Sequence, residues 1–206
     1  MVNMARFNNG VREKEMAEIA HRLGMQFVAE EEWSLVERLD DFYLFKRGGR
    51  KRILNMMMRK DPLLHEELYV FDYQYTISTG KSAHTYRQTV FFIKSRQLAL
   101  PEFLMKPESI FHKIGAYLGM QDIDFEEHPE FSNQYLLQSE DETRTRSMMK
   151  PEVARFFTVN RDWSMEGIGY YLILYKNNKL LPSNVIRDFY QKGLQLYEWL
   201  REEDIL

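Results

Sequence analysis

The chain has 206 residues, of which 44% are hydrophobic and 29% charged, and its formal net charge is −3. This composition is ordinary for a globular protein, and the lack of a basic excess argues against a general nucleic-acid binder. The sequence contains no cysteine, so it excludes disulfides, thiol nucleophiles and thiolate metal sites. It contains neither a signal peptide nor an apolar run of ~18 residues, so we expect a cytoplasmic protein without a transmembrane segment.

A helix is predicted over residues 11–23, because its apolar residues recur on one stripe. The stripe consists of Met16, Ile19, Ala20 and Leu23. Gly24 follows at the position where a glycine commonly ends a helix. We expect residues 1–10 to form a flexible N-terminus.

A second helix is predicted over residues 108–118, between Pro107 and Gly119. Both predicted helices run into the same four letters, LGMQ, at residues 23–26 and 118–121. The shared order of helix, glycine stop and later strand indicates a weak internal repeat.

The repeat predicts two pseudo-repeated halves, residues 11–106 and 107–206, within a single α+β domain that spans residues 11–206. In each half an apolar strand is predicted after the helix. These strands are FYLF at 42–45 and QYLL at 134–137.

The strongest β signal lies at residues 68–77 and 84–94, which are rich in aromatic and β-branched residues. A turn over residues 78–83 predicts a hairpin register, since side chains alternate between the faces of a strand. The predicted pairs are Tyr75 opposite Tyr86, Phe71 opposite Val90 and Tyr69 opposite Phe92. The reverse face then gathers Asp72, Gln74, Arg87 and Thr89, and a structural ion pair between Asp72 and Arg87 is favoured over a catalytic role for Asp72.

The letters Gly80-Lys81-Ser82 match the end of a phosphate-binding loop. Such a loop has a glycine five positions earlier and leads into a helix whose amides hold the phosphates. Here Tyr75 occupies the glycine position, and a predicted strand follows Ser82. The sequence therefore favours a hairpin turn and predicts no nucleotide and no other cofactor.

A short basic segment, RGGRKR, occupies residues 47–52 between the FYLF strand and a strand that begins ILNMMM. Gly48-Gly49 indicates a hairpin turn. Its four cations are Arg47, Arg50, Lys51 and Arg52. They form either a solvated hairpin tip or a binding site for a phosphate or an acidic partner. The three methionines at 56–58 fit either core filling, which we favour, or an adhesive surface.

The remaining elements follow from periodicity. Residues 131–138 and 169–175 are predicted as strands, and residues 140–158 as helix broken at Lys150-Pro151. The last helix is predicted over about 183–201, with an apolar stripe.

An acidic segment, QDIDFEEHPE, covers residues 121–130. If it is extended, four potential ligands share one face, because strand side chains repeat every two residues. These ligands are Asp122, Asp124, Glu126 and His128. Carboxylates and imidazole suit Mn²⁺ or Mg²⁺. The alternative is a solvated acidic loop without a metal.

Three tracts carry a resemblance to a known family: FDYQYTISTGKSAHTYRQTV at 71–90, QDIDFEEHPEFSNQYLL at 121–137 and WSMEG at 163–167. They resemble a family of uncharacterised bacterial proteins with tracts of the form FDYxYTxxxGKxxxTYRQTV and QDIDFxxHPEFS. Some of its members carry an N-terminal transmembrane segment, which we do not expect in this protein. The resemblance implies no activity, ligand or catalytic residue.

Taken together, the patterns predict an α+β fold with a curved antiparallel sheet and flanking helices packed on one side. The favoured function is a non-catalytic binding or scaffold module of unknown ligand. Its ligand would contact Gln74, Arg87 and Thr89 on the reverse sheet face, or the basic segment 47–52. The alternative is a metal-dependent hydrolase built on residues 122–128, so enzyme activity stays open.

Overall fold

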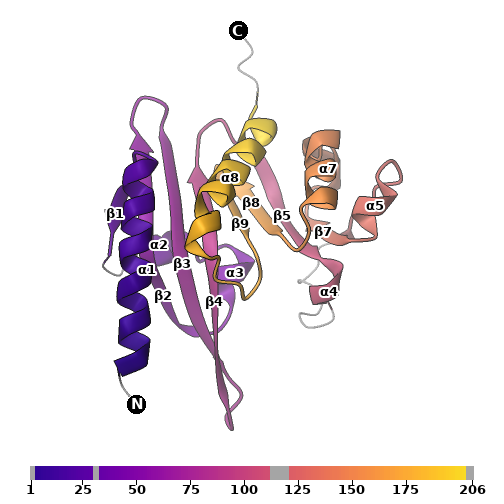
Figure 1. Ribbon diagram of the computed structural model, residues 1–206. Coiled ribbons are helices and arrows are strands. Elements are labelled where there is room, and N and C mark those ends of the chain that lie inside the picture. The colour runs from indigo at the N-terminus through magenta and orange to yellow at the C-terminus, as the bar shows by residue number, and fades with distance from the viewer. Residues whose placement is uncertain (1–2, 30–32, 112–120, 203–206) are drawn as a thin grey trace.

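A computed structural model of the chain describes residues 3–29, 33–111 and 121–202. Within these residues, nine strands form one open, curled antiparallel sheet in the order β1-β2-β3-β4-β9-β8-β5-β7-β6 (Figure 1). The strands are β1 (Gln26–Val28), β2 (Gly49–Asp61), β3 (Glu66–Ser78), β4 (Ala83–Lys94), β5 (Leu100–Pro107), β6 (Gln121–Asp122), β7 (Tyr135–Ser139), β8 (Ser164–Gly169) and β9 (Tyr171–Tyr175). The predicted α+β fold with a curved antiparallel sheet is therefore confirmed.

Helices flank this sheet. They are α1 (Asn3–Arg22), α2 (Trp33–Arg38), α3 (Tyr43–Lys46), α4 (Glu108–Phe111), α5 (Pro129–Ser132), α6 (Glu142–Met148), α7 (Pro151–Val159), the 3₁₀ turn η1 (Ser183–Val185) and α8 (Ile186–Leu200). The break at Lys150-Pro151 and the last helix are confirmed. Helix α1 begins at Asn3, so it takes in most of the stretch predicted to be flexible. The second predicted helix is described only as α4, and the rest of it lies outside the described residues.

The β3–β4 hairpin has the predicted register. Tyr75 pairs with Tyr86, and Phe71 pairs with Val90. The turn is closed by a hydrogen bond of 2.9 Å from the amide of Thr79 to the carbonyl of Ser82. Gly80 adopts the left-handed conformation that favours glycine. Because β4 begins directly after the turn, the helix that a phosphate-binding loop requires is not formed here.

Two predicted strands are wrong or misplaced. FYLF at 42–45 forms the short helix α3, so Gly48-Gly49 joins a helix to β2 and is no hairpin turn. A short apolar run does not distinguish a strand from a buried helix segment, and Phe45 is fully buried. In the predicted strand 131–138, the first residues belong to α5, which Pro129 starts, since proline suits the first helical position.

Helices cover both faces of the sheet, which corrects the expectation of a single helical layer. On one face α1, α7 and α8 bury the larger hydrophobic cluster, and α2 and α3 bury a second cluster on the other face (Figure 1). The prediction that the methionine run fills the core is confirmed for two of its residues. Met57 packs in the first cluster and Met56 in the second.

The two LGMQ tracts lead to opposite edges of the sheet. Gln26 opens β1, which pairs with β2, and Gln121 opens β6, which pairs with β7. These two short strands are the edge strands of the sheet. The equivalence of the two halves stays a prediction.

Candidate functional site

A groove of about 590 Å³ lies over β3 and β4, between α1 and the segment that leads into α8. Its lining comprises Val11, Arg12, Glu15, Leu54, Asn55, Asp72, Tyr73, Gln74, Arg87, Leu180, Leu181, Pro182, Ser183 and Asn184. We call this space the groove. It occupies the reverse face of the β3–β4 hairpin, where the sequence predicted polar side chains.

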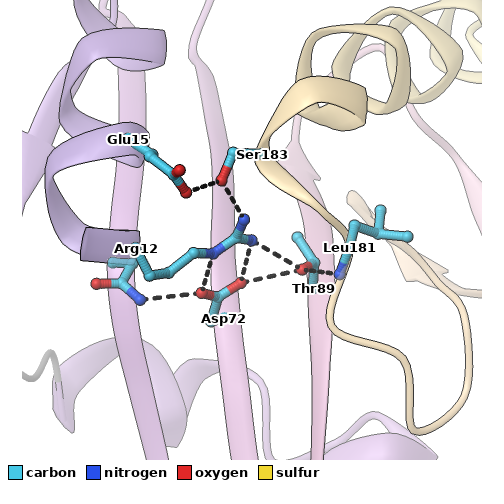
Figure 2. Close-up of polar contacts among 7 residues, drawn as sticks. Arg12, Glu15, Asp72, Thr89, Leu181 and Ser183 are labelled. Carbon is cyan, nitrogen blue, oxygen red and sulfur yellow. Dashed lines mark hydrogen bonds and ion pairs between the residues drawn. The ribbon is translucent and has the colours of Figure 1, made fainter. Parts of the chain in front are cut away.

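At the base of the groove, Asp72 is surrounded by hydrogen-bond donors (Figure 2). Arg12 donates from Nε to Oδ2 and from Nη2 to Oδ1, both at 3.0 Å. Asn55 donates to Oδ2 at 2.9 Å, and Thr89 donates to Oδ1 at 3.0 Å. The side chains of Arg12 and Asp72 are only 12% and 6% exposed. The buried carboxylate is therefore neutralised and hydrogen-bonded, as burial of a charge requires.

The network continues into the segment before α8. The amide of Leu181 donates to the Thr89 hydroxyl at 3.0 Å, and Arg12 Nη1 donates to Ser183 Oγ at 2.9 Å. Ser183 Oγ in turn donates to Glu15 on α1. Figure 2 shows this continuous path from α1 across the sheet to the segment before α8. The network thus holds both walls of the groove against its base.

Local backbone geometry brings these side chains together. Asp72 and Thr89 are direct partners in the β3–β4 register, so their side chains share one face. Asn55 adopts φ of +51° where the β2–β3 register shifts. Asparagine tolerates this left-handed conformation, and a bulge re-aims a side chain. The bulge therefore points Asn55 at the carboxylate.

The predicted ion pair between Asp72 and Arg87 is wrong. Arg87 lies opposite Gln74 in the register and donates from Nε to Gln74 Oε1 at 2.7 Å. Asp72 is paired instead with Arg12, 60 positions away in the sequence. Because this partner comes from α1, the hairpin sequence alone contained no signal for it.

Of the predicted ligand residues, Gln74 and Arg87 line the groove, and Thr89 belongs to the network beneath it. Sequence reasoning missed Arg12, the 180–184 segment and Asn55. For Asn55 a signal existed, since asparagine is uncommon within an apolar strand such as ILNMMM and indicates an irregularity there.

The basic segment 47–52 does not form one free cationic surface. Arg47 donates to Asn177 Oδ1 at 3.3 Å and lies over the Tyr75 ring, 5.4 Å from its centroid. Lys51 forms an ion pair of 2.8 Å with Asp40. Arg50 and Arg52 are exposed. Much of the predicted cluster is thus engaged within the chain.

The predicted metal ligands do not come together. The chain turns at Glu126–Glu127, so the assumed strand alternation ends there. Asp122, Asp124 and Glu126 are exposed. In the part of the chain that the structure describes, no three acidic or histidine side chains are placed to hold a metal ion. The hydrolase alternative therefore has no geometric support among these residues.

A second buried polar cluster lies on the other face of the sheet. Glu166 accepts a hydrogen bond of 2.6 Å from the Tyr175 hydroxyl and one of 3.2 Å from the amide of Leu44. Burial raises the pKa of Glu166, and the positive charge of Lys106 offsets only part of this increase. Burial likewise lowers the pKa of Lys106 to about 7, and its ammonium lies over the Tyr43 ring. The adjoining space, about 10 Å³, is too small for a substrate. Because Glu166 binds the amide of Leu44, the cluster anchors α3 to the sheet.

No protein-family model matches the sequence, and no curated protein matches it. Among solved structures, the chain is similar to the crystal structure of the mycobacterial trehalose monomycolate transport factor A, TtfA. The similarity covers 91% of each chain with a TM-score of 0.64 and 12% sequence identity. Across the described residues, no helix is both long and apolar enough to span a membrane. The chain therefore shares the fold of TtfA over nearly its whole length.

Proposed function

We propose that the protein is a non-catalytic binding or scaffold module, and that the groove takes up an uncharged amphipathic ligand. The observation that carries this proposal is a concave surface with a neutralised polar base and an apolar rim. Ligand sites in proteins are commonly concave, mostly apolar and supplied with a few fixed polar groups.

The charges of the groove balance one another. Arg12 and Arg87 face Asp72 and Glu15, and the Arg12–Asp72 pair is closed on itself. An ion would gain little at the base of the groove, because it would have to break the pair of Arg12 and Asp72. Gln74 and Arg87 offer hydrogen bonds to a neutral polar group at the open side.

The rim of the groove offers apolar contacts. Val11 on α1 and Leu180 on the opposite wall are 49% and 42% exposed, and Leu54 also belongs to the lining. Covering these side chains with an apolar ligand moiety removes hydrophobic surface from water, which favours binding. A ligand with one apolar part and one neutral polar part therefore fits the groove best.

The polar groups of the groove are poorly arranged for catalysis. The Asp72 carboxylate already accepts bonds from Arg12, Asn55 and Thr89, so it has little capacity left to act as a base. The Ser183 hydroxyl oxygen accepts a hydrogen bond from Arg12. A lone pair of this oxygen therefore points at a cation, which makes the hydroxyl a poor nucleophile. These arrangements favour a structural role for both groups.

The proposal is tested with N-phenyl-1-naphthylamine, an uncharged amphipathic probe whose fluorescence rises in apolar surroundings. Titration of the full chain should give saturable binding. The double variant Val11→Ser, Leu180→Ser should raise the Kd about tenfold, because two half-exposed apolar contacts are lost. Both positions lie on the rim, so the fold should be kept, which thermal unfolding checks.

The matched control is the double variant Leu63→Ser, Leu64→Ser, which removes two exposed apolar side chains from the β2–β3 turn. It should bind the probe like the wild type. Absence of saturable binding, or equal weakening by both double variants, would refute the groove as the binding site.

A further inference from the structure

A second hollow, of about 500 Å³, lies on the other side of the segment before α8. Leu181 and Pro182 line both this hollow and the groove, so they form a shared wall. The Trp163 ring, which also lines the hollow, stacks on Phe189 with centroids 5.0 Å apart and an interplanar angle of 7°. The hollow is thus built on a firmly packed part of the core.

The charged side chains of this hollow are mainly cationic. Its lining includes Arg161, Lys176, Lys179 and Lys192, against Asp188 as the acidic residue. Lys192 and Asp188 form an ion pair of 2.5 Å. Across the described residues, the other three cations have no carboxylate within 4.0 Å. We call this space the cationic hollow; it is unusual in a chain whose formal net charge is −3.

Lys176 is held in place within the cationic hollow. Its ammonium donates to the carbonyl of Arg161 at 2.8 Å and lies over the Trp163 ring, 4.7 Å from the centroid. Burial lowers its pKa, Asp162 opposes this effect, and the charges of Lys179 and Lys192 lower the pKa further. Like charges therefore repel one another here, and an anion between them would relieve that repulsion.

The backbone also fixes Lys179. Its amide donates to the carbonyl of Lys176, and its carbonyl accepts from the amide of Thr89 on β4, both at 3.2 Å. Two apolar side chains of the same lining are exposed, Val159 at the end of α7 by 73% and Val185 by 36%. The cationic hollow therefore combines the fixed ammonium of Lys176 and the anchored backbone of Lys179 with exposed apolar side chains.

We propose that the cationic hollow binds the phosphoryl group of a small ligand, with Arg161, Lys176 and Lys179 as the residues that contact it. Lys176 and Lys179 are close enough for their charges to interact, and Arg161 belongs to the same lining. Cations grouped in this way suit a ligand group that carries more than one negative charge and several acceptor oxygens. A free phosphate compound and a lipid phosphomonoester both present this chemistry. The exposed apolar side chain of Val159 would add contacts to the second of these.

The test is calorimetric titration of the full chain with pyrophosphate, with dihexanoyl phosphatidic acid and with zwitterionic dihexanoyl phosphatidylcholine, each lipid as a monomer. The first two should bind, and the third should not. Tighter binding of the phosphatidic acid identifies a lipid source, and equal or tighter binding of pyrophosphate identifies a free phosphate compound. Absence of binding by both, or equal binding of phosphatidylcholine, overturns the proposal.

Variants locate the site. The double variant Arg161→Ala, Lys179→Ala removes two exposed cations and should raise the Kd for pyrophosphate about tenfold, because charge-assisted hydrogen bonds are lost. The double variant Arg59→Ala, Lys81→Ala removes the same charge from exposed positions elsewhere and should change the Kd less than twofold. Equal effects of the two double variants would contradict a local site.

A second readout follows the ammonium of Lys176 by NMR. Saturation with pyrophosphate should raise its pKa, since a nearby anion favours the charged form. Binding of pyrophosphate to the cationic hollow should not depend on the groove, so the two proposals can fail separately. The groove variant Val11→Ser, Leu180→Ser should bind pyrophosphate normally, and Arg161→Ala, Lys179→Ala should bind N-phenyl-1-naphthylamine normally.

Discussion

The guanidinium of Arg12 meets the carboxylate of Asp72 through two hydrogen bonds of 3.0 Å, although 60 positions separate the two residues in the sequence. The pair joins the first helix to the third strand at the base of the groove (Figure 2). Because both side chains are nearly buried, each depends on the other to compensate its charge.

Replacing one member of this pair should therefore be costly. We expect Arg12→Met to lower the free energy of unfolding by about 3 kcal/mol, because it leaves Asp72 as a buried charge without a cation. The double variant Arg12→Met, Asp72→Asn should cost less than the sum of the two single variants. Urea unfolding of the four proteins gives the coupling.

Arg22→Met serves as the control for this cycle. Arg22 lies on the same helix and pairs with Glu18, but both side chains are exposed. Its replacement should change stability by less than about 0.5 kcal/mol. Equal costs for Arg12→Met and Arg22→Met would show that the Arg12–Asp72 pair does not fix α1 to the sheet.

Gly193 on α8 packs directly against Phe91 of β4. A Cβ at this position would lie 2.4 Å from the Phe91 ring, which is fully buried. Alanine in a helix normally stabilises relative to glycine, but here the overlap should dominate. We expect Gly193→Ala to lower the unfolding free energy by about 1–3 kcal/mol in urea unfolding.

The same substitution at Gly10 should have the opposite sign. Gly10 lies within α1, and among the described residues no atom outside its own stretch of helix lies within 4 Å of an added Cβ. We expect Gly10→Ala to raise the unfolding free energy by roughly 0.5–1 kcal/mol. A stabilising Gly193→Ala would contradict the packing of α8 on β4.

Glu67 predicts a pH dependence of stability. Burial would raise its pKa, but the hydrogen bond from Tyr69 and the charge of Arg38 outweigh burial and lower the pKa from 4.5 to about 2. A lowered folded-state pKa stabilises the fold fully above the unfolded-state value, and this contribution is lost as pH falls through the folded-state value. Glu67→Gln should therefore cost about 1–2 kcal/mol at pH 7 and much less near pH 2, since the 21% exposed side chain is partly screened.

Urea unfolding at both pH values measures this difference, with Glu142→Gln as the comparison. Glu142 pairs with Arg146 on an exposed helix surface, and its replacement should have a small effect at either pH. A cost of Glu67→Gln that stays constant between pH 7 and pH 2 would contradict the lowered pKa.

Local patterns predicted the elements whose signal lies in their own residues. The β3–β4 register followed from alternation, because a slip of one residue would turn Tyr75 and Phe71 away from their core. The FYLF segment failed because its structure depends on distant residues. The amide of Leu44 in α3 donates a hydrogen bond to the carboxylate of Glu166, which is 122 positions away in the sequence.

Two central strands were missed for a related reason. Strand β5 contains Pro101 and Pro107, and β8 contains Gly167 and Gly169, residues that usually mark turns. Pairing with each other and with β7 and β9 overrides these local preferences. Only part of the candidate site was predicted. The hairpin sequence indicated Gln74 and Arg87, but the two walls of the groove belong to α1 and to residues 180–184, which are distant in the sequence.

Amide chemical-shift mapping of the full chain under titration with N-phenyl-1-naphthylamine tests the groove proposal most directly. We expect the largest saturable shift changes at the amides of Leu54, Gln74, Arg87, Leu180, Leu181, Ser183 and Asn184. Largest changes at the β2–β3 turn or around Val159 and Trp163, or no saturable change, would contradict it.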